Sequence, residues 1–201
     1  LAIRESVTQG KKVAPEQVIP SVYLKSMSDL YSNMQYENVV KLAKLALSNS
    51  DNTDGKILYE IQYSLCSALA KLKHPDFMEE VQKLDYDDRK FLTAFYYRQI
   101  GKNDRALCYL NELLSKRPEM SKAKREKVLV LKNLQQFEEA TGLAKENYYL
   151  YSDNPYHIQA YFDCLINTYH NKPEDDLLLD LLHLEVAVDG LGEEVELLVL
   201  E

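Results

Sequence analysis

The feature of this sequence that most restricts its fold is a repeat of 34 residues. Segment 87–120 aligns with segment 121–154, and the alignment places Ala106 and Ala140 at equivalent positions. In each segment a helical stretch ends in a short polar turn, and a second helical stretch begins just before that alanine. A fixed period of this length is typical of stacked helical or strand units, each of which contacts its neighbours, rather than of one globular core.

Weaker copies of the same unit extend the pattern in both directions, with Val39 at the alanine position of the first copy. The units are expected near 20–53, 54–86, 87–120, 121–154 and 155–188. Asn103, Ser121 and Asn154 are candidate N-caps, and Pro155 suits a first helical position. The spacing predicts helices over residues 20–33, 36–49, 55–72, 76–84, 87–100, 103–117, 121–134, 137–150, 155–169 and 174–188.

The composition agrees with helices, because 201 residues contain only six glycines and six prolines. An all-β chain of this length needs more turn residues. The fifteen tyrosines allow two interpretations. They can fill the core between repeats, as we expect for Tyr97 and Tyr161, or they can form an aromatic binding groove.

The 34-residue unit resembles the tetratricopeptide repeat (TPR), a helix–turn–helix repeat with small residues where the two helices cross. Segment 87–120 departs from the family pattern at Lys90 and Thr93. The residues that match it are Ala94, Tyr97, Ala106, Leu110 and Pro118, followed in the next unit by Val128, Leu131, Ala140 and Ala144. The resemblance implies an all-α fold, a right-handed superhelix of about five helical hairpins.

The resemblance also implies a function, because TPR proteins bind peptides on the inner face formed by the first helix of each unit. By alignment the inner positions include Phe95, Gln159 and Asp163. We expect a scaffold that binds a protein or peptide partner, with no catalysis in this piece. The residues expected to contact the partner are Arg98, Lys122, Arg125, Lys132, Asn133 and Asn167.

The charge is unevenly distributed along the chain, whose net charge is −8. Segment 173–201 holds ten acidic residues and no Lys or Arg, so the other 172 residues carry +2. Segment 116–132 holds seven basic and two acidic residues, a net +5. A basic inner helix favours an acidic partner, although the same lysines can simply be solvated. Weak nucleic-acid binding through 116–132 is an alternative that the overall negative charge opposes.

No motif for catalysis or for a cofactor is present in the sequence, and the four histidines are scattered. We therefore expect no enzyme activity, cofactor or metal. The three cysteines lie far apart, which predicts buried free thiols in the cytoplasm rather than disulfides. No apolar run is long enough to cross a membrane. Because the sequence lacks a starting Met, an alternative is that this piece is the sensor or assembly domain of a larger enzyme, such as a signalling ATPase.

The expected domain organisation is a linker or the remnant of a preceding element at 1–19, a repeat domain at 20–188 and an acidic apolar tail at 189–201. The helix expected at 174–188 is apolar nearly all round between Leu177 and Leu184. Because such a helix is normally buried, either residues 186–200 fold back over it, or the native protein continues, or two copies of the chain meet there. We predict a homodimer through this helix.

Overall fold

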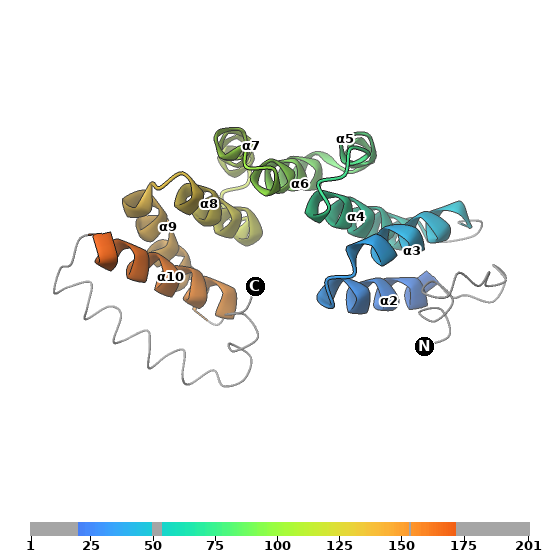
Figure 1. The fold of residues 1–201 in the computed structure, drawn as a ribbon, viewed down its shortest axis with the longest axis horizontal. Helices are drawn as coiled ribbons and strands as arrows, with labels where there is room; N and C mark the ends of the chain where they lie inside the picture. The colour runs from blue at the N-terminus through green and yellow to red at the C-terminus, as the bar shows by residue number, and fades with distance from the viewer. Residues whose placement is uncertain (1–19, 50–53, 153, 172–201) are drawn as a thin grey trace. The chain divides into compact units, whose positions relative to one another are not determined.

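The computed structural model describes residues 20–49, 54–152 and 154–171, and within these ranges the chain is helical and contains no strand. This confirms the predicted all-α class. The helices, labelled in Figure 1, are α2 (Pro20–Ser32), α3 (Tyr36–Ser48), α4 (Gly55–Lys71), α5 (Phe77–Glu80), the 3-10 turn η2 (Val81–Lys83), α6 (Tyr86–Gln99), α7 (Asn103–Lys116), α8 (Ser121–Asn133), α9 (Phe137–Leu150) and α10 (Pro155–Asn171).

The long helices begin and end within two residues of their predicted limits. The predicted helix over 76–84 is instead a single α-helical turn followed by η2. The predictions for 1–19, for the helix at 174–188 with its homodimer, and for the tail at 189–201 lie outside the described residues.

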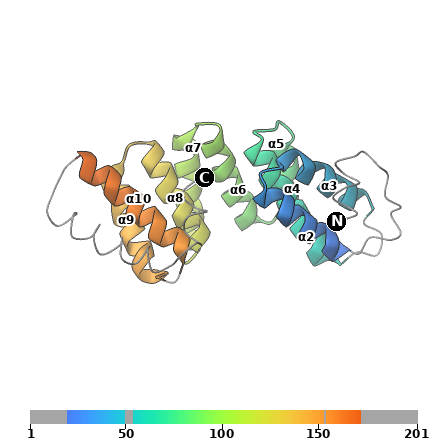
Figure 2. The same ribbon diagram turned by 60° about the horizontal axis from the view of Figure 1, so that its bottom comes forward.

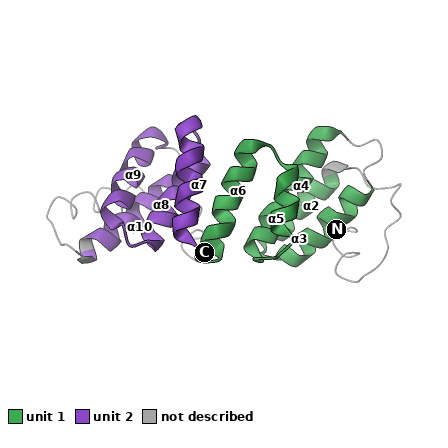
Figure 3. Ribbon diagram, turned by 90° about the horizontal axis from the view of Figure 1, so that it is seen from above, with its two compact units in different colours: residues 1–101 green, residues 102–201 purple. Residues whose placement is uncertain are grey.

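The chain divides into two compact units, residues 1–101 and residues 102–201 (Figure 3). The boundary lies between α6 and α7, inside the repeat 87–120 whose sequence matches the TPR pattern most closely. Each unit has its own hydrophobic core.

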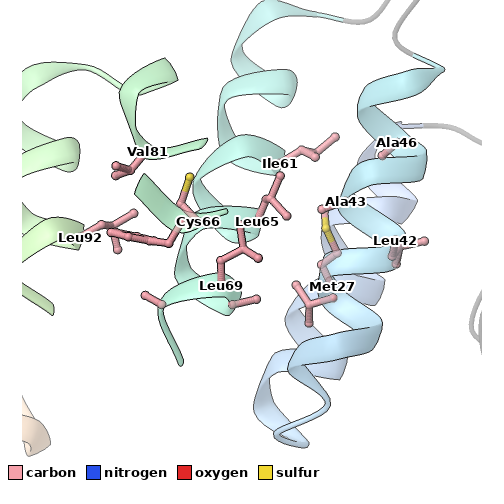
Figure 4. Close-up of a cluster of buried hydrophobic side chains, with 14 of the residues drawn as sticks. Met27, Leu42, Ala43, Ala46, Ile61, Leu65, Cys66, Leu69, Val81 and Leu92 are labelled. Atoms are coloured by element: carbon pink, nitrogen blue, oxygen red, sulfur yellow. The ribbon is translucent and has the colours of Figure 1, made fainter. Parts of the chain in front are cut away.

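The core of unit 1 forms around α4, which packs against α2, α3 and α6. Figure 4 shows Leu65 and Leu69 of α4 between side chains of α2 and α3 on one side and Leu92 of α6 on the other. These leucines are at most 1% exposed. Burying a side chain of this size stabilises the fold by about 1.5–3 kcal/mol, so the apolar faces hold the helices together.

In unit 2, α9 packs against α8 and α10, and α8 also contacts both α7 and α10 (Figure 1 and Figure 2). The two alanines that define the repeat, Ala106 and Ala140, are fully buried. Their small side chains let neighbouring helices approach closely, as the period predicts. Tyr161 is 2% exposed and lies in the unit 2 core, and Tyr97 in unit 1 is also buried, so both match the core interpretation.

Four helices are followed by a residue with a left-handed backbone conformation, two positions after the last helical residue. The turn residues are Met34, Lys73, Gly101 and Gln135, with φ between 54° and 76°. After α8, the N–H of Gln136 donates to the carbonyl of Leu131 and the N–H of Gln135 donates to that of Lys132. This is the Schellman arrangement, which satisfies carbonyls at the helix end. Only one of these four positions carries glycine, the residue that most favours this conformation.

Of the three predicted N-caps, Asn154 is confirmed, because its Oδ1 accepts a hydrogen bond from the N–H of Tyr156 at 3.0 Å. The other two predictions are wrong by one residue. Lys102 and Met120 precede α7 and α8, and neither side chain caps its helix. Asn103 and Ser121 are instead the first helical residues, and their side chains bond to other helices.

Two of the three cysteines are buried, one in each unit. Burial raises the pKa of the Cys66 thiol in unit 1 to about 12 and that of Cys164 in unit 2 to about 11. Cys108 on α7 is exposed, so the prediction that all three are buried is wrong for this residue. All three thiols are free.

Candidate functional site

Five of the six predicted contact residues lie in unit 2. Lys122, Arg125, Lys132 and Asn133 belong to α8, and Asn167 belongs to α10. These two helices contact each other, although a complete helix, α9, separates them in the sequence. Arg98 belongs to α6 in unit 1.

An ion pair joins the last turn of α8 to the middle of α10. The Nζ atom of Lys132 lies 3.4 Å from Oδ2 of Asp163, and the Lys132 side chain is 20% exposed. The amide of Asn167 donates to the backbone carbonyl of Asp163 at 2.6 Å, one turn further along α10. The structure therefore brings Lys132 and Asn167 together around one aspartate.

A second contact between the same helices involves Arg125. Its guanidinium lies over the ring of Tyr156, 4.5 Å from the ring centroid. The two contacts share one register, since Arg125 precedes Tyr156 by 31 residues and Lys132 precedes Asp163 by 31 residues. Within the described part of the chain, the Arg125 side chain makes no hydrogen bond and no ion pair.

The other two predicted contact residues of α8 lie at the ends of the helix. Lys122 is exposed, in the first turn of the helix. Asn133 is exposed at the other end, where its amide donates to Oδ1 of Asn103 at 3.3 Å. Asn133 is therefore joined to α7 rather than to α10.

Most of the positive charge of segment 116–132 lies beside a carboxylate. Lys124 pairs with Glu146 at 3.6 Å and Lys127 with Glu139 at 3.7 Å, both on α9. Arg117 and Lys132 pair with Glu119 and Asp163. The segment contains two acidic residues, and its ion pairs add three carboxylates from α9 and α10. Together with the seven basic residues these five carboxylates leave a net charge of +2, rather than the +5 of the linear segment.

Apolar side chains are exposed at the junction of α9 and α10. Tyr149 is 68% exposed, Leu150 58% and Tyr156 47%. A hollow of about 510 Å³ opens here, and Tyr156 contributes to its wall while it also stacks under Arg125. The described lining residues are Leu150, Tyr151, Ser152, Asn154, Pro155 and Tyr156.

A buried histidine, which the sequence did not single out, contacts a residue that lines this hollow. His157 is 1% exposed, its Nε2 lies 2.7 Å from Oγ of Ser121, and its ring stacks on Tyr151. Burial lowers the pKa of His157, and the nearby positive charges of Arg125 and Lys124 lower it further. His157 thus links the first turn of α8 to the first turn of α10 in its neutral form.

In unit 1 the predicted residue Arg98 belongs to a cluster of cations and aromatic rings. Its guanidinium lies 5.4 Å from the centroid of the Phe95 ring. Lys71 also lies over Phe95, at 5.7 Å, and over Tyr36, at 5.8 Å. Tyr36 in turn contacts the edge of Tyr31, with centroids 5.0 Å apart. Sequence alignment identified Phe95 and Arg98 as inner-face positions but missed Lys71 and Tyr36.

Neither a metal centre nor a membrane span is found in the described part of the chain. The described residues include no group of three or more His, Cys, Asp or Glu side chains that could hold a metal ion. Among the described helices, none combines the length and the apolar character required to cross a membrane.

Comparison with solved structures finds a likeness in fold. The chain is similar to the crystal structure of a thermophilic TPR protein from Thermus thermophilus, with a TM-score of 0.57 and 18% sequence identity. The match covers 84% of this chain and 100% of the other. No family model matches the sequence, and no curated protein matches it. At this identity the likeness concerns the fold, which is that of a TPR helical repeat.

Proposed function

We propose that this chain binds a protein or peptide partner through the face formed by α8 and α10, and that the partner supplies acidic side chains. The observation that carries the proposal is the unequal pairing of the cations on this face. Lys132 has a carboxylate neighbour, whereas Arg125 has only the Tyr156 ring among the described residues. A guanidinium that lies over an aromatic ring can still donate its N–H groups to a carboxylate.

The rest of the face supports a peptide rather than a small molecule. Lys132 and Asn167 lie towards the C-terminal ends of α8 and α10, past Arg125. The exposed Tyr149, Leu150 and Tyr156 lie near the opposite end of this face. An extended partner with an acidic group at Arg125 and an apolar side chain at the adjacent hollow can also reach Lys132 and Asn167 at the other end. Because packed helices hold these residues in place before binding, little ordering entropy is lost.

The six predicted residues do not contribute equally to this proposal. Arg125 is the principal contact, and a partner must compete with Asp163 for Lys132. Lys122 and Asn133 are contacts at the ends of α8. Arg98 is a contact of unit 1, outside the face formed by α8 and α10.

The test compares two arginines of the same segment. Arg125→Glu should weaken partner binding by about tenfold or more, since a reversed charge repels an acidic ligand. Arg117→Glu is the matched control, because Arg117 is 56% exposed, pairs with Glu119 and lies outside both α8 and α10. The full chain, immobilised, is used to isolate partners, and affinities are then measured with each purified partner. Equal affinities for the two variants would contradict the proposal.

No observation on the described residues specifically supports the other interpretations of the sequence. Nucleic-acid binding needs unneutralised cations, and the ion pairs of segment 116–132 argue against it. A role as the sensor or assembly domain of a larger enzyme is compatible with peptide binding, and the full-length gene would test it. A cytoplasmic location and a homodimer through 174–188 stay predictions, as does the absence of catalysis.

A further inference from the structure

His157, near the start of α10, is a buried titratable group that touches the neighbouring helices. Its side chain is 1% exposed, and its Nε2 atom lies 2.7 Å from Oγ of Ser121 on α8. Its ring stacks on Tyr151, directly after α9, with centroids 4.9 Å apart. The Nδ1 atom has no hydrogen-bond partner among the described residues. Within these residues no carboxylate pairs with the imidazole, so its charged form has no compensating anion there.

The charges that act on His157 are positive and come from α8. Arg125 lies over the ring of Tyr156, the residue directly before His157, at 4.5 Å from the centroid. Lys124, the other cation, pairs with Glu146 of α9 at 3.6 Å. Burial lowers the pKa of His157, and the charges of Arg125 and Lys124 lower it further. Without a partner, the imidazole therefore stays neutral at a pH where an exposed histidine is partly protonated.

Arg125 and His157 belong to one pair of adjacent contacts between α8 and α10. Ser121 and Arg125 are four residues apart on α8, so they lie on the same face of that helix. Their partners on α10, His157 and Tyr156, are consecutive residues. A carboxylate that binds Arg125 thus brings negative charge close to the imidazole. Opposite charge nearby favours the protonated form of a histidine.

We propose that an acidic partner bound at Arg125 promotes the uptake of a proton from solvent by His157, so that the α8–α10 face binds this partner more tightly at mildly acidic than at neutral pH. The inference rests on the proposed function, because it concerns the same arginine and the same class of partner. A ligand that favours the protonated form is itself bound more tightly where that form is populated. The affinity is therefore constant above the pKa of His157 in the complex, and it rises as the pH falls through that value. It levels off below the pKa of His157 in the free protein.

The first part of the experiment uses the full chain without a ligand. The imidazole signals of isotope-labelled histidine are followed by NMR against pH in the wild type, Arg125→Gln and Arg125→Glu. The last variant places a carboxylate next to His157. The titration midpoint of His157 should rise from the wild type to Arg125→Gln and again to Arg125→Glu, by about half a pH unit or more in total. The midpoint of His170, an exposed residue at the other end of α10, should not move.

The second part measures binding of a blocked peptide, Glu-Glu-Tyr-Glu-Glu, by isothermal titration calorimetry at about pH 7.5 and about pH 5.5, where the peptide carboxylates stay ionised. The wild type should bind it about threefold or more tightly at the lower pH. The binding heat at that pH should vary with the ionisation enthalpy of the buffer, which reports proton uptake. His157→Gln should lose most of the pH dependence. His170→Gln is the matched control, since it removes the other imidazole of α10 and should behave as the wild type.

Either of two results would overturn the inference: the same His157 midpoint in the wild type and Arg125→Glu, or the same pH dependence of binding in the wild type and His157→Gln. Should His157→Gln fail to fold, the NMR titration decides the question, because it leaves His157 in place. Arg125→Glu separates this inference from the proposed function. If that variant binds the peptide as tightly as the wild type, the proposed function is wrong and the inference falls with it. If it binds more weakly while His157→Gln keeps the wild-type pH dependence, only the inference is wrong.

Discussion

At the scale of single residues, the environment of His157 leads to the clearest prediction, a pH dependence of stability. The imidazole is 1% exposed, contacts Ser121 through Nε2, and has no partner for Nδ1 among the described residues. Burial, and then the charges of Arg125 and Lys124, lower its pKa in the folded chain. A proton added to His157 would therefore be bound without compensation in a place that already faces two cations.

We predict that protonation of His157 destabilises the protein as the pH falls. Above the ordinary histidine pKa of about 6.5 the side chain is neutral in both the folded and the unfolded chain, and the stability is unaffected. Below that value the unfolded chain binds the proton more readily, so the free energy of unfolding decreases until the lower folded-state pKa is passed. The decrease from this one group cannot exceed about 1.4 kcal/mol per pH unit.

The measurement is urea unfolding of the wild type and of His157→Gln between about pH 7.5 and pH 5, on either side of the ordinary histidine pKa. The variant keeps a neutral hydrogen-bonding group near Ser121 but cannot titrate. Its stability should fall less over this range than that of the wild type. Identical pH profiles would show that His157 does not titrate differently in the folded and unfolded chains.

The candidate site could be predicted from the sequence only in part, and the residues explain why. Alignment on the 34-residue period placed Arg125, Lys132 and Asn167 on one face, because the period fixes which helix faces are equivalent. Arg125 and Lys132, however, contact residues that lie 31 positions later, about one helical turn less than the repeat. The period alone does not contain that shift, so Tyr156 was missed. Lys71 was missed as well, since its ring partners come from two other helices.

At the scale of elements, α9 shows how the repeat limits side-chain size. Ala140 is fully buried, while Gly142, two residues later, is exposed and would meet no atom within 4 Å if it carried a Cβ. Ala140→Leu should destabilise the protein by about 1–3 kcal/mol, because overpacking separates α9 from its neighbours. Gly142→Ala should stabilise it by about 0.5–1 kcal/mol through helix propensity.

Thermal or urea unfolding of the two single variants checks this pair of opposite effects. Both substitutions add only carbon atoms to the same helix, so each serves as the control for the other. A destabilising Gly142→Ala, or an Ala140→Leu without effect, would mean that α9 packs differently from the arrangement described.

Helix positions were predictable because hydrophobic period, proline and turn residues agree at most helix ends. The turns themselves were not, since Met34, Lys73 and Gln135 adopt a left-handed conformation that their residue types do not indicate. The short α5 also differed from the prediction. Leu84 ends this stretch in an extended conformation, so the predicted helix over 76–84 consists of one α turn and one 3-10 turn.

At the scale of the whole molecule, the division into two units implies that stability is distributed between two cores. The unit 1 core contains Leu65, and the unit 2 core contains Leu131; both are at most 1% exposed. In repeat proteins each unit contacts only its neighbours, so a local loss of stability need not spread evenly.

We predict that core substitutions act mainly within their own unit. Leu65→Ala should cost about 2–5 kcal/mol and accelerate hydrogen exchange in α3 and α4 more than in α8 and α9. Leu131→Ala should do the opposite. Exchange followed by mass spectrometry resolves the two groups of helices. Equal acceleration in both units, for either variant, would show that the chain unfolds as one cooperative body.

The two buried cysteines give this molecule an internal reporter of such events. Cys66 lies in the core of unit 1 and Cys164 in that of unit 2, and both thiols have a raised pKa. A protonated, inaccessible thiol reacts with an alkylating reagent only after its surroundings open. The modification rates of Cys66 and Cys164 therefore time the opening of each unit in the unmodified protein, while the exposed Cys108 gives the reagent's unhindered rate.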